Sequence, residues 1–139
     1  MQSANDAVRS VVITGSSRGI GLGLAEAFAQ RGCAVVLSGR DQARVDRAVE
    51  HVRKRFPTAR CTGLACDVTR ETELRALWQH AQHGARHVDC WINNAGTCNP
   101  IRPIHELSPS ELADVVQTNL LGTMLGSRIA VEAMLAQGH

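Results

Sequence analysis

The sequence predicts an α/β protein built on a parallel β-sheet, and two observations carry this prediction. Short β-branched segments alternate with longer amphipathic segments from the first residues onward, as in parallel βαβ units. Residues 10–21 then read Ser-Val-Val-Ile-Thr-Gly-Ser-Ser-Arg-Gly-Ile-Gly, so a buried strand runs into a glycine-punctuated turn that opens a helix. Such a turn is typical of phosphate-binding loops.

Four strands are expected, over residues 10–14, 33–38, 61–66 and 88–93. Four helices alternate with them, over residues 19–31, 41–56, 70–82 and 109–137. Apolar residues at helical spacing predict the buried face of each of the first three helices: Ile20, Leu24, Ala27 and Phe28; Val45, Val49 and Val52; and Leu74, Leu77, Trp78 and Ala81. Asp41 is the expected N-cap of the second helix.

The fourth helix has the clearest start, because Ser108 and Glu111 form a capping box around Pro109. A helix over residues 109–137 would be roughly 40 Å long, so we expect a kink near Gly122 or Gly126. The four-residue spacing of these glycines would also permit close packing, either within the fold or against another subunit.

Composition narrows the range of functions. The 139 residues are 44% apolar and 20% charged, with a formal net charge of +2, which suits one globular domain. The longest basic run is Arg53-Lys54-Arg55, and the apolar runs are strand-sized, so we expect no nucleic-acid partner and no membrane segment. Five cysteines without a CxxC pair favour reduced thiols and a cytoplasmic protein.

Three glycines define the candidate ligand site. Gly15, Gly19 and Gly21 occupy positions where a side chain would block the approach of a pyrophosphate to the backbone. The N-terminus of the following helix supplies free N–H groups. A tight turn that only packs a helix is the alternative, but the strand, turn and helix context favours a dinucleotide.

Two motifs resemble those of the short-chain dehydrogenase/reductase family. Residues 14–21 match Thr-Gly-x-x-x-Gly-Ile-Gly without substitution, and residues 93–96 read Asn-Asn-Ala-Gly after the fourth strand. The resemblance implies a Rossmann-like doubly wound parallel sheet that is incomplete, with four strands in the order 3-2-1-4 and flanking helices. It also implies that the cofactor is bound by Gly15, Ser17, Arg18, Gly19, Ile20, Gly21, Asn94, Ala95 and Gly96.

The resemblance assigns further roles residue by residue. Asp67 and Val68 are similar to the family's adenine-contacting pair, although Asp67 is also a good turn or N-cap residue. Asn119 is similar to the asparagine that orders a water beside the catalytic lysine, which gives it a catalytic role. The alternative is a residue that is solvated or bonds locally.

The end of the second strand favours NADP(H) over NAD(H). Members that prefer NAD carry a carboxylate there for the ribose 2′-hydroxyl, whereas a 2′-phosphate needs cations. Gly39 occupies that position, Arg40 follows it, and Arg18 lies in the glycine turn. Asp41 is also close, but its capping role would direct it at the helix backbone.

The family's catalytic acid is missing from these residues. Its members use a Ser, a Tyr and a Lys four residues after the Tyr, yet this sequence has no Tyr and only Lys54. We therefore expect residues 1–139 to be the NADP-binding N-terminal half of a reductase that acts on a small carbonyl or alcohol substrate, inactive alone and a homo-oligomer when full length. The alternative is a non-catalytic NADP(H)-binding module completed by a partner chain.

Two narrower features complete the sequence-based predictions. Trp91-Ile92, the proline-containing loop after Gly96 and residues 118–123 resemble the chlorophyll(ide) b reductase branch, which would make the chloroplast the alternative compartment. His80, His83 and His87 fall at i, i+3 and i+7, but Gly84 is expected to end the helix first, so we predict no metal site.

Overall fold

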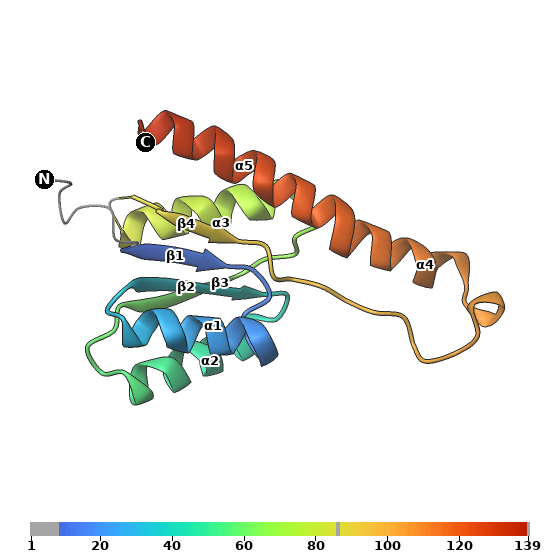
Figure 1. The fold of residues 1–139 in the computed structure, drawn as a ribbon, viewed down its shortest axis with the longest axis horizontal. Coiled ribbons are helices and arrows are strands. Elements are labelled where there is room, and N and C mark those ends of the chain that lie inside the picture. Colours follow the sequence, from blue (N-terminus) through green and yellow to red (C-terminus); the bar gives the residue numbers. More distant parts are fainter. Residues whose placement is uncertain (1–8, 86, 139) are drawn as a thin grey trace, which may run out of the picture.

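A computed structural model describes residues 9–85 and 87–138 of the chain. Four parallel strands form one sheet in the order β3-β2-β1-β4, which confirms the predicted topology. The strands are β1 (Ser10–Ile13), β2 (Ala34–Gly39), β3 (Cys61–Ala65) and β4 (Cys90–Ile92). Helices α1 (Gly19–Gln30) and α2 (Gln42–Arg55) cover one face, and α3 (Glu71–Gly84) and α5 (Gly122–Gln137) cover the other (Figure 1).

The register aligns the carboxyl ends of the strands at one edge of the sheet. Ile13 of β1 pairs with Leu37 of β2 and with Ile92 of β4, so all three strands end at nearly the same level. Because the strands are parallel, the turns that follow them meet at this edge. The sheet thereby brings together segments that lie about 80 residues apart in the chain, such as Thr14 and Asn94.

Side chains alternate between two apolar clusters because strand residues point to opposite faces in turn. Val11, Ile13, Val35 and Leu37 pack against α1 and α2, whereas Val12 and Val36 pack against α3 and α5. The predicted inner faces of α2 and α3 are confirmed, since Val45, Val49, Val52, Leu74, Leu77, Trp78 and Ala81 are all buried.

The predicted inner face of α1 is wrong at its start. Ile20 is 80% exposed, whereas Gly21, Ala25 and Ala29 are buried. Small residues on the inner side let the helix lie close to the sheet, and Leu24 and Phe28 pack only at the border of the core. The first turn of α1 therefore faces away from the core rather than into it.

The long C-terminal helix is continuous but changes its winding. It comprises α4 (Pro109–Val115), a π-helical segment η2 (Val116–Leu121) and α5, after a short 3₁₀ turn η1 (Ile104–Glu106). The predicted capping box is present, because the Ser108 hydroxyl accepts the Glu111 N–H and the Glu111 carboxylate accepts the Ser108 N–H. The interruption falls immediately before Gly122, one of the two glycines where a kink was expected.

The two glycines of this helix pack within the fold. A Cβ on Gly122 would lie 2.7 Å from Val68 Cγ2, and one on Gly126 would lie 3.1 Å from Trp91 Nε1. The outer face of the helix instead carries exposed apolar side chains, among them Leu112, Val116, Leu120, Met124, Val131 and Leu135. Within residues 9–85 and 87–138, no helix combines the length and apolar character needed to cross a membrane.

Replacing Gly63 with alanine will destabilise the fold. A Cβ at this β3 position would lie 2.5 Å from Val45 Cγ1 and 3.0 Å from Val49 Cγ2, so the core must shift. Overpacking of this kind costs about 1–3 kcal/mol of the free energy of unfolding, which urea denaturation measures.

Gly23→Ala is the matched control for Gly63→Ala. Gly23 is exposed within α1, and a Cβ there would meet no atom within 4 Å. The substitution will raise the free energy of unfolding by about 0.5–1 kcal/mol through helix propensity. Equal effects at the two glycines would contradict the packing argument.

Candidate functional site

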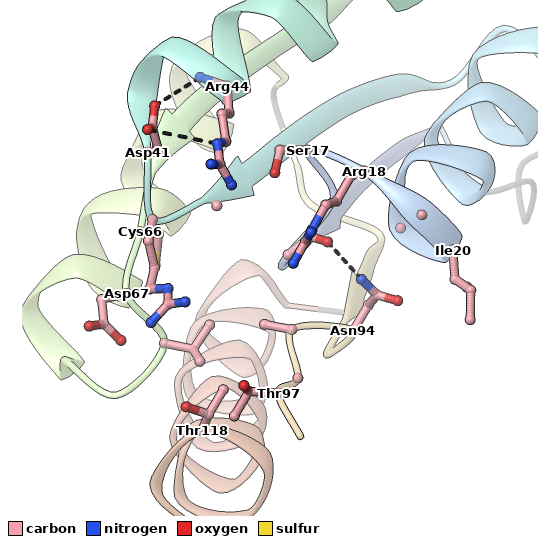
Figure 2. A pocket seen from close by; sticks show the side chains of 18 residues that line it. Ser17, Arg18, Ile20, Asp41, Arg44, Cys66, Asp67, Asn94, Thr97 and Thr118 are labelled. Carbon is pink, nitrogen blue, oxygen red and sulfur yellow. Dashed lines mark hydrogen bonds and ion pairs between the residues drawn. The ribbon is translucent and has the colours of Figure 1, made fainter. Parts of the chain in front are cut away.

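One pocket of about 350 Å³ opens at the carboxyl ends of the strands (Figure 2). The structure brings to it all twelve residues that the sequence assigned to cofactor binding: Gly15, Ser17, Arg18, Gly19, Ile20, Gly21, Arg40, Asp67, Val68, Asn94, Ala95 and Gly96. Six further residues line it: Gly39, Asp41, Arg44, Cys66, Thr97 and Thr118. Helical spacing predicted that Ile20 would lie in the core, but its side chain is exposed and lines the pocket.

The glycine turn is shaped by positive φ and by close contacts. Gly15 and Gly19 have φ values of 61° and 59°, which side chains disfavour. A Cβ on Gly15 would lie 2.6 Å from Ala95 Cα, and one on Gly21 would lie 2.5 Å from Asn94 Nδ2. The space beside Gly19 is open, so this glycine leaves room for a ligand next to the backbone.

Helix α1 begins at this turn without a side-chain cap. Arg18 is its N-cap residue, and its side chain accepts no hydrogen bond from the first turn. The first N–H groups of a helix need an acceptor, and together with the helix dipole they favour an anion. Backbone and pocket therefore fit a phosphate group, as the sequence predicted.

The Thr14 hydroxyl joins the glycine turn to the end of β4. Its Oγ1 accepts the N–H groups of Asn94 and Ala95, at 3.0 and 3.1 Å, and donates to the carbonyl of Ile92 at 3.3 Å. In return, Nδ2 of Asn94 donates to the carbonyls of Thr14 and Gly15, both at 3.0 Å. Thr14 belongs to the first motif, but its residue type and position alone did not predict this bridging role.

Ser16 joins the same turn to the end of β2. Its buried hydroxyl donates to the carbonyl of Ile13 at 2.6 Å and accepts the N–H of Ser38 at 3.0 Å. Its own N–H donates to the Ser38 carbonyl at 2.7 Å. The glycine turn is thus held on both sides by neighbouring strands.

The end of β2 is rich in positive charge. Arg18, Arg40 and Arg44 all line the pocket around Gly39. A Cβ on Gly39 would lie 3.0 Å from Ser17 Oγ, so the absence of a side chain keeps this corner open. As predicted, Asp41 caps α2, accepting the Arg44 N–H at 3.0 Å.

Asp67 lies across the pocket, in the turn after β3. Its Oδ1 accepts the Thr69 N–H at 3.0 Å and the Thr69 hydroxyl at 2.8 Å, so it is a turn residue while Arg70 is the N-cap of α3. Burial raises the pKa of the Asp67 carboxyl, but these hydrogen bonds and the charges of Arg40 and Arg70 outweigh it and lower the pKa overall. The carboxylate is therefore charged at neutral pH.

The neighbouring Cys66 is a neutral thiol. Burial, reinforced by the charges of Glu73 and Asp67, raises its pKa to about 12. A thiol with such a pKa is a poor nucleophile at neutral pH. Cys66 therefore contributes an uncharged wall to the pocket.

Asn119 does not line the pocket but holds a residue that does. Its Oδ1 accepts the Thr97 N–H and its Nδ2 donates to the Thr97 carbonyl, both at 2.8 Å. Asn119 lies in the π-helical segment η2, a winding often found at functional sites. The side-chain amide of Asn119 thus bonds both the N–H and the carbonyl of Thr97, as a residue of a neighbouring strand can do.

The histidine stripe shows no metal-binding arrangement. Among the described residues, no group of three or more His, Cys, Asp and Glu side chains could hold a metal ion. His83 instead contacts the Gln79 carbonyl on its own helix, at 2.7 Å.

A parallel sheet whose first strand ends in a glycine turn at a helix N-terminus defines a dinucleotide-binding α/β protein. The family model described as short chain dehydrogenase matches residues 9–139, and the chain belongs to this family. Chlorophyll(ide) b reductase NOL of Arabidopsis thaliana is 40% identical over 131 residues, which cover 94% of this chain and 37% of that protein. L-fucose dehydrogenase of Oryctolagus cuniculus is 38% identical, with 91% and 43% covered.

Solved structures of the family superpose closely on the chain. An actinorhodin polyketide ketoreductase variant with NADPH gives a TM-score of 0.86 at 28% identity, covering 98% of this chain and 52% of that one. A metagenomic short-chain oxidoreductase in complex with NADP gives 0.82 at 27% identity, covering 94% and 58%. The chain thus spans about half the length of these structures.

Thr14→Val will loosen the junction between the glycine turn and β4. The isosteric change removes the oxygen that accepts the Asn94 and Ala95 N–H groups, and the side chain at position 14 stays buried. Leaving such donors without a partner costs about 1–3 kcal/mol. Urea denaturation measures the loss, and amide exchange at residues 94 and 95 will accelerate. Thr14→Ser keeps the oxygen and will retain most of the protection; equal exchange in both variants would contradict this role.

The low pKa of Asp67 predicts an acid-dependent contribution to stability. Because the folded pKa lies below the ordinary value of 3.8, the contribution is present at neutral pH and is lost as pH falls through the folded pKa. Wild type will therefore lose more free energy of unfolding between about pH 5 and about pH 3 than Asp67→Asn does. Parallel pH curves for the two proteins would contradict the prediction.

Proposed function

We propose that the chain binds NADP(H) in the pocket described above, as the cofactor-binding part of a short-chain oxidoreductase. The observation that carries this proposal is that Gly39, at the end of β2, stands in place of a carboxylate and lines one pocket with Arg18, Arg40 and Arg44. The opening at Gly39 and the cations around it suit a ribose 2′-phosphate. The NADPH and NADP named with the neighbouring structures support the same choice.

Each part of the pocket has a role in this proposal. The α1 N-terminus and the glycine turn bind the pyrophosphate through backbone N–H groups, with Gly19 leaving the space. Asp67 and Val68 contact the adenine, while Asn94, Ala95 and Gly96 form the wall at the end of β4. When bound, the cofactor supplies the hydride of a reversible carbonyl–alcohol conversion.

Residues 1–139 lack the tyrosine and the lysine four residues after it that would donate a proton in that reaction. The sequence contains no tyrosine, and its one lysine, Lys54, forms an ion pair with Glu50 on the exposed side of α2. Reduction of a carbonyl needs an acid at the developing alkoxide. We therefore propose that residues 1–139 bind the cofactor without turning over a substrate. In the whole enzyme, Asn119 serves catalysis by holding the loop at Thr97.

A small carbonyl or alcohol compound is the proposed substrate of the whole enzyme, and a chlorophyll(ide) b reductase-like activity is the narrower proposal. The identity to NOL and to the probable reductase NYC1 supports it. Both relatives are named as chloroplastic, which supports the chloroplast over the cytoplasm as the proposed compartment.

The second proposal is a non-catalytic NADP(H)-binding module that is completed by a partner chain. β4 pairs only with β1 among the described strands, and the outer face of α4 and α5 exposes large apolar side chains. Further polypeptide would cover both, either from the same gene or from a partner, and homo-oligomers are proposed for the complete enzyme. An open reading frame that continues through a Tyr-x-x-x-Lys pattern would favour the enzyme over the non-catalytic binding module.

Arg40→Asp will abolish the preference for NADPH over NADH. Wild type will bind NADPH at least tenfold more tightly than NADH, because each charge-assisted bond to phosphate contributes about 1.5–3 kcal/mol. The variant places a carboxylate beside Gly39 and will lose this preference, as calorimetric titration of both nucleotides measures. Arg60→Asp, at an exposed position outside the pocket, is the charge control. Equal or tighter NADH binding by wild type would overturn the NADP(H) assignment.

A further inference from the structure

We propose that Arg44 is a specificity-determining residue that binds the 2′-phosphate together with Arg40, and that Asp41 is the positioning residue that directs it there. This inference rests on the proposed NADP(H) function. It concerns a residue that neither of the two sequence motifs contains.

The first turn of α2 holds Arg44 at the pocket. Asp41 caps the helix through Oδ1, 3.0 Å from the Arg44 N–H, and its Oδ2 lies 3.9 Å from Arg44 Nε. One carboxylate thus engages both the backbone and the near side of the guanidinium. The terminal Nη groups are the part left to meet a ligand, and Figure 2 shows the Arg44 side chain on the pocket wall between Asp41 and Ser17.

Each of the two carboxylates that line the pocket has its own cations. Asp67 is stabilised as a carboxylate by Arg40 and Arg70, whereas Asp41 is engaged by Arg44. A phosphate monoester carries a charge of about −1.5 to −2 at neutral pH, so Arg40, whose charge also acts on Asp67, needs a further cation from Arg18 or Arg44 to balance it. Arg44 lines the same pocket as Gly39 and supplies such a cation from the first turn of α2.

Capping also explains why Asp41 does not oppose the phosphate. Its negative charge lies at the N-terminus of α2, where the helix dipole and the Arg44 N–H stabilise it. Asp41 is therefore directed at the helix and at Arg44 rather than at a ribose hydroxyl. This arrangement turns the one carboxylate near Gly39 into a support for a phosphate ligand.

The experiment compares adenosine 2′,5′-bisphosphate with adenosine 5′-monophosphate, which differ only in the 2′-phosphate, by calorimetry on the 139-residue chain. Arg44→Gln will weaken binding of the bisphosphate about tenfold and leave the monophosphate unchanged. Arg44→Lys will recover part of the loss, since it keeps the charge without the planar fork. Arg47→Gln is the matched control, because Arg47 is exposed on the same helix and lies outside the pocket lining.

Asp41→Asn separates positioning from capping. Asparagine is as good an N-cap as aspartate, so α2 remains intact, but the attraction on Arg44 Nε is lost. The variant will weaken bisphosphate binding about threefold in the wild-type background and will have no effect in the Arg44→Gln background. Equal effects in both backgrounds would overturn the positioning role.

The outcomes separate this inference from the proposed function. If wild type binds both nucleotides equally, the NADP(H) proposal itself fails. If wild type prefers the bisphosphate and Arg40→Gln abolishes the preference while Arg44→Gln behaves like Arg47→Gln, only the role of Arg44 fails. A tenfold loss in Arg44→Gln alongside an unaffected Arg47→Gln supports the inference.

Discussion

The site depends on the contact between the glycine turn and the end of β4. Gly15 approaches Ala95 so closely that even a methyl group would lie 2.6 Å from its Cα. Thr14 and Asn94 fasten the two segments to one another with hydrogen bonds in both directions. Because this contact fixes the floor of the pocket, the α1 N-terminus, the β2 end and the loop after β4 all take their positions from it.

The parallel sheet also determines where the charged residues of the pocket lie. Parallel strands end at one edge, so residues from three separate turns place their charges around a single opening. Asp41 and Asp67 each face cations, and both carboxylates also accept backbone N–H groups. The carboxylates of the pocket are therefore engaged by hydrogen bonds and cations, and the pocket also contains arginines and an uncapped helix N-terminus, which favour an anion.

Much of this could be predicted because it is local. The capping residues Asp41 and Ser108 and the inner faces of α2 and α3 follow from spacing and turn chemistry, whereas the strand order was implied by the family resemblance. Ile20 was misplaced because helical periodicity cannot show that the first turn of α1 faces a pocket. The sequence did not show that Arg44 lines the pocket, because an arginine on an exposed helix face resembles any solvated residue; only the fold brings it to the same pocket as Gly39.

The π-helical segment η2 is a non-local feature as well. Nothing in the sequence of residues 116–121 distinguishes them from an ordinary helix, yet the winding accompanies the pairing of Asn119 with Thr97 and the packing of Gly122 on Val68. The contact between Ser17 and Gly39 has an evolutionary consequence. A side chain at position 39 would place its Cβ 3.0 Å from the Ser17 hydroxyl, so the serine must shift slightly when this glycine is replaced, and the residues tolerated at positions 17 and 39 depend on each other.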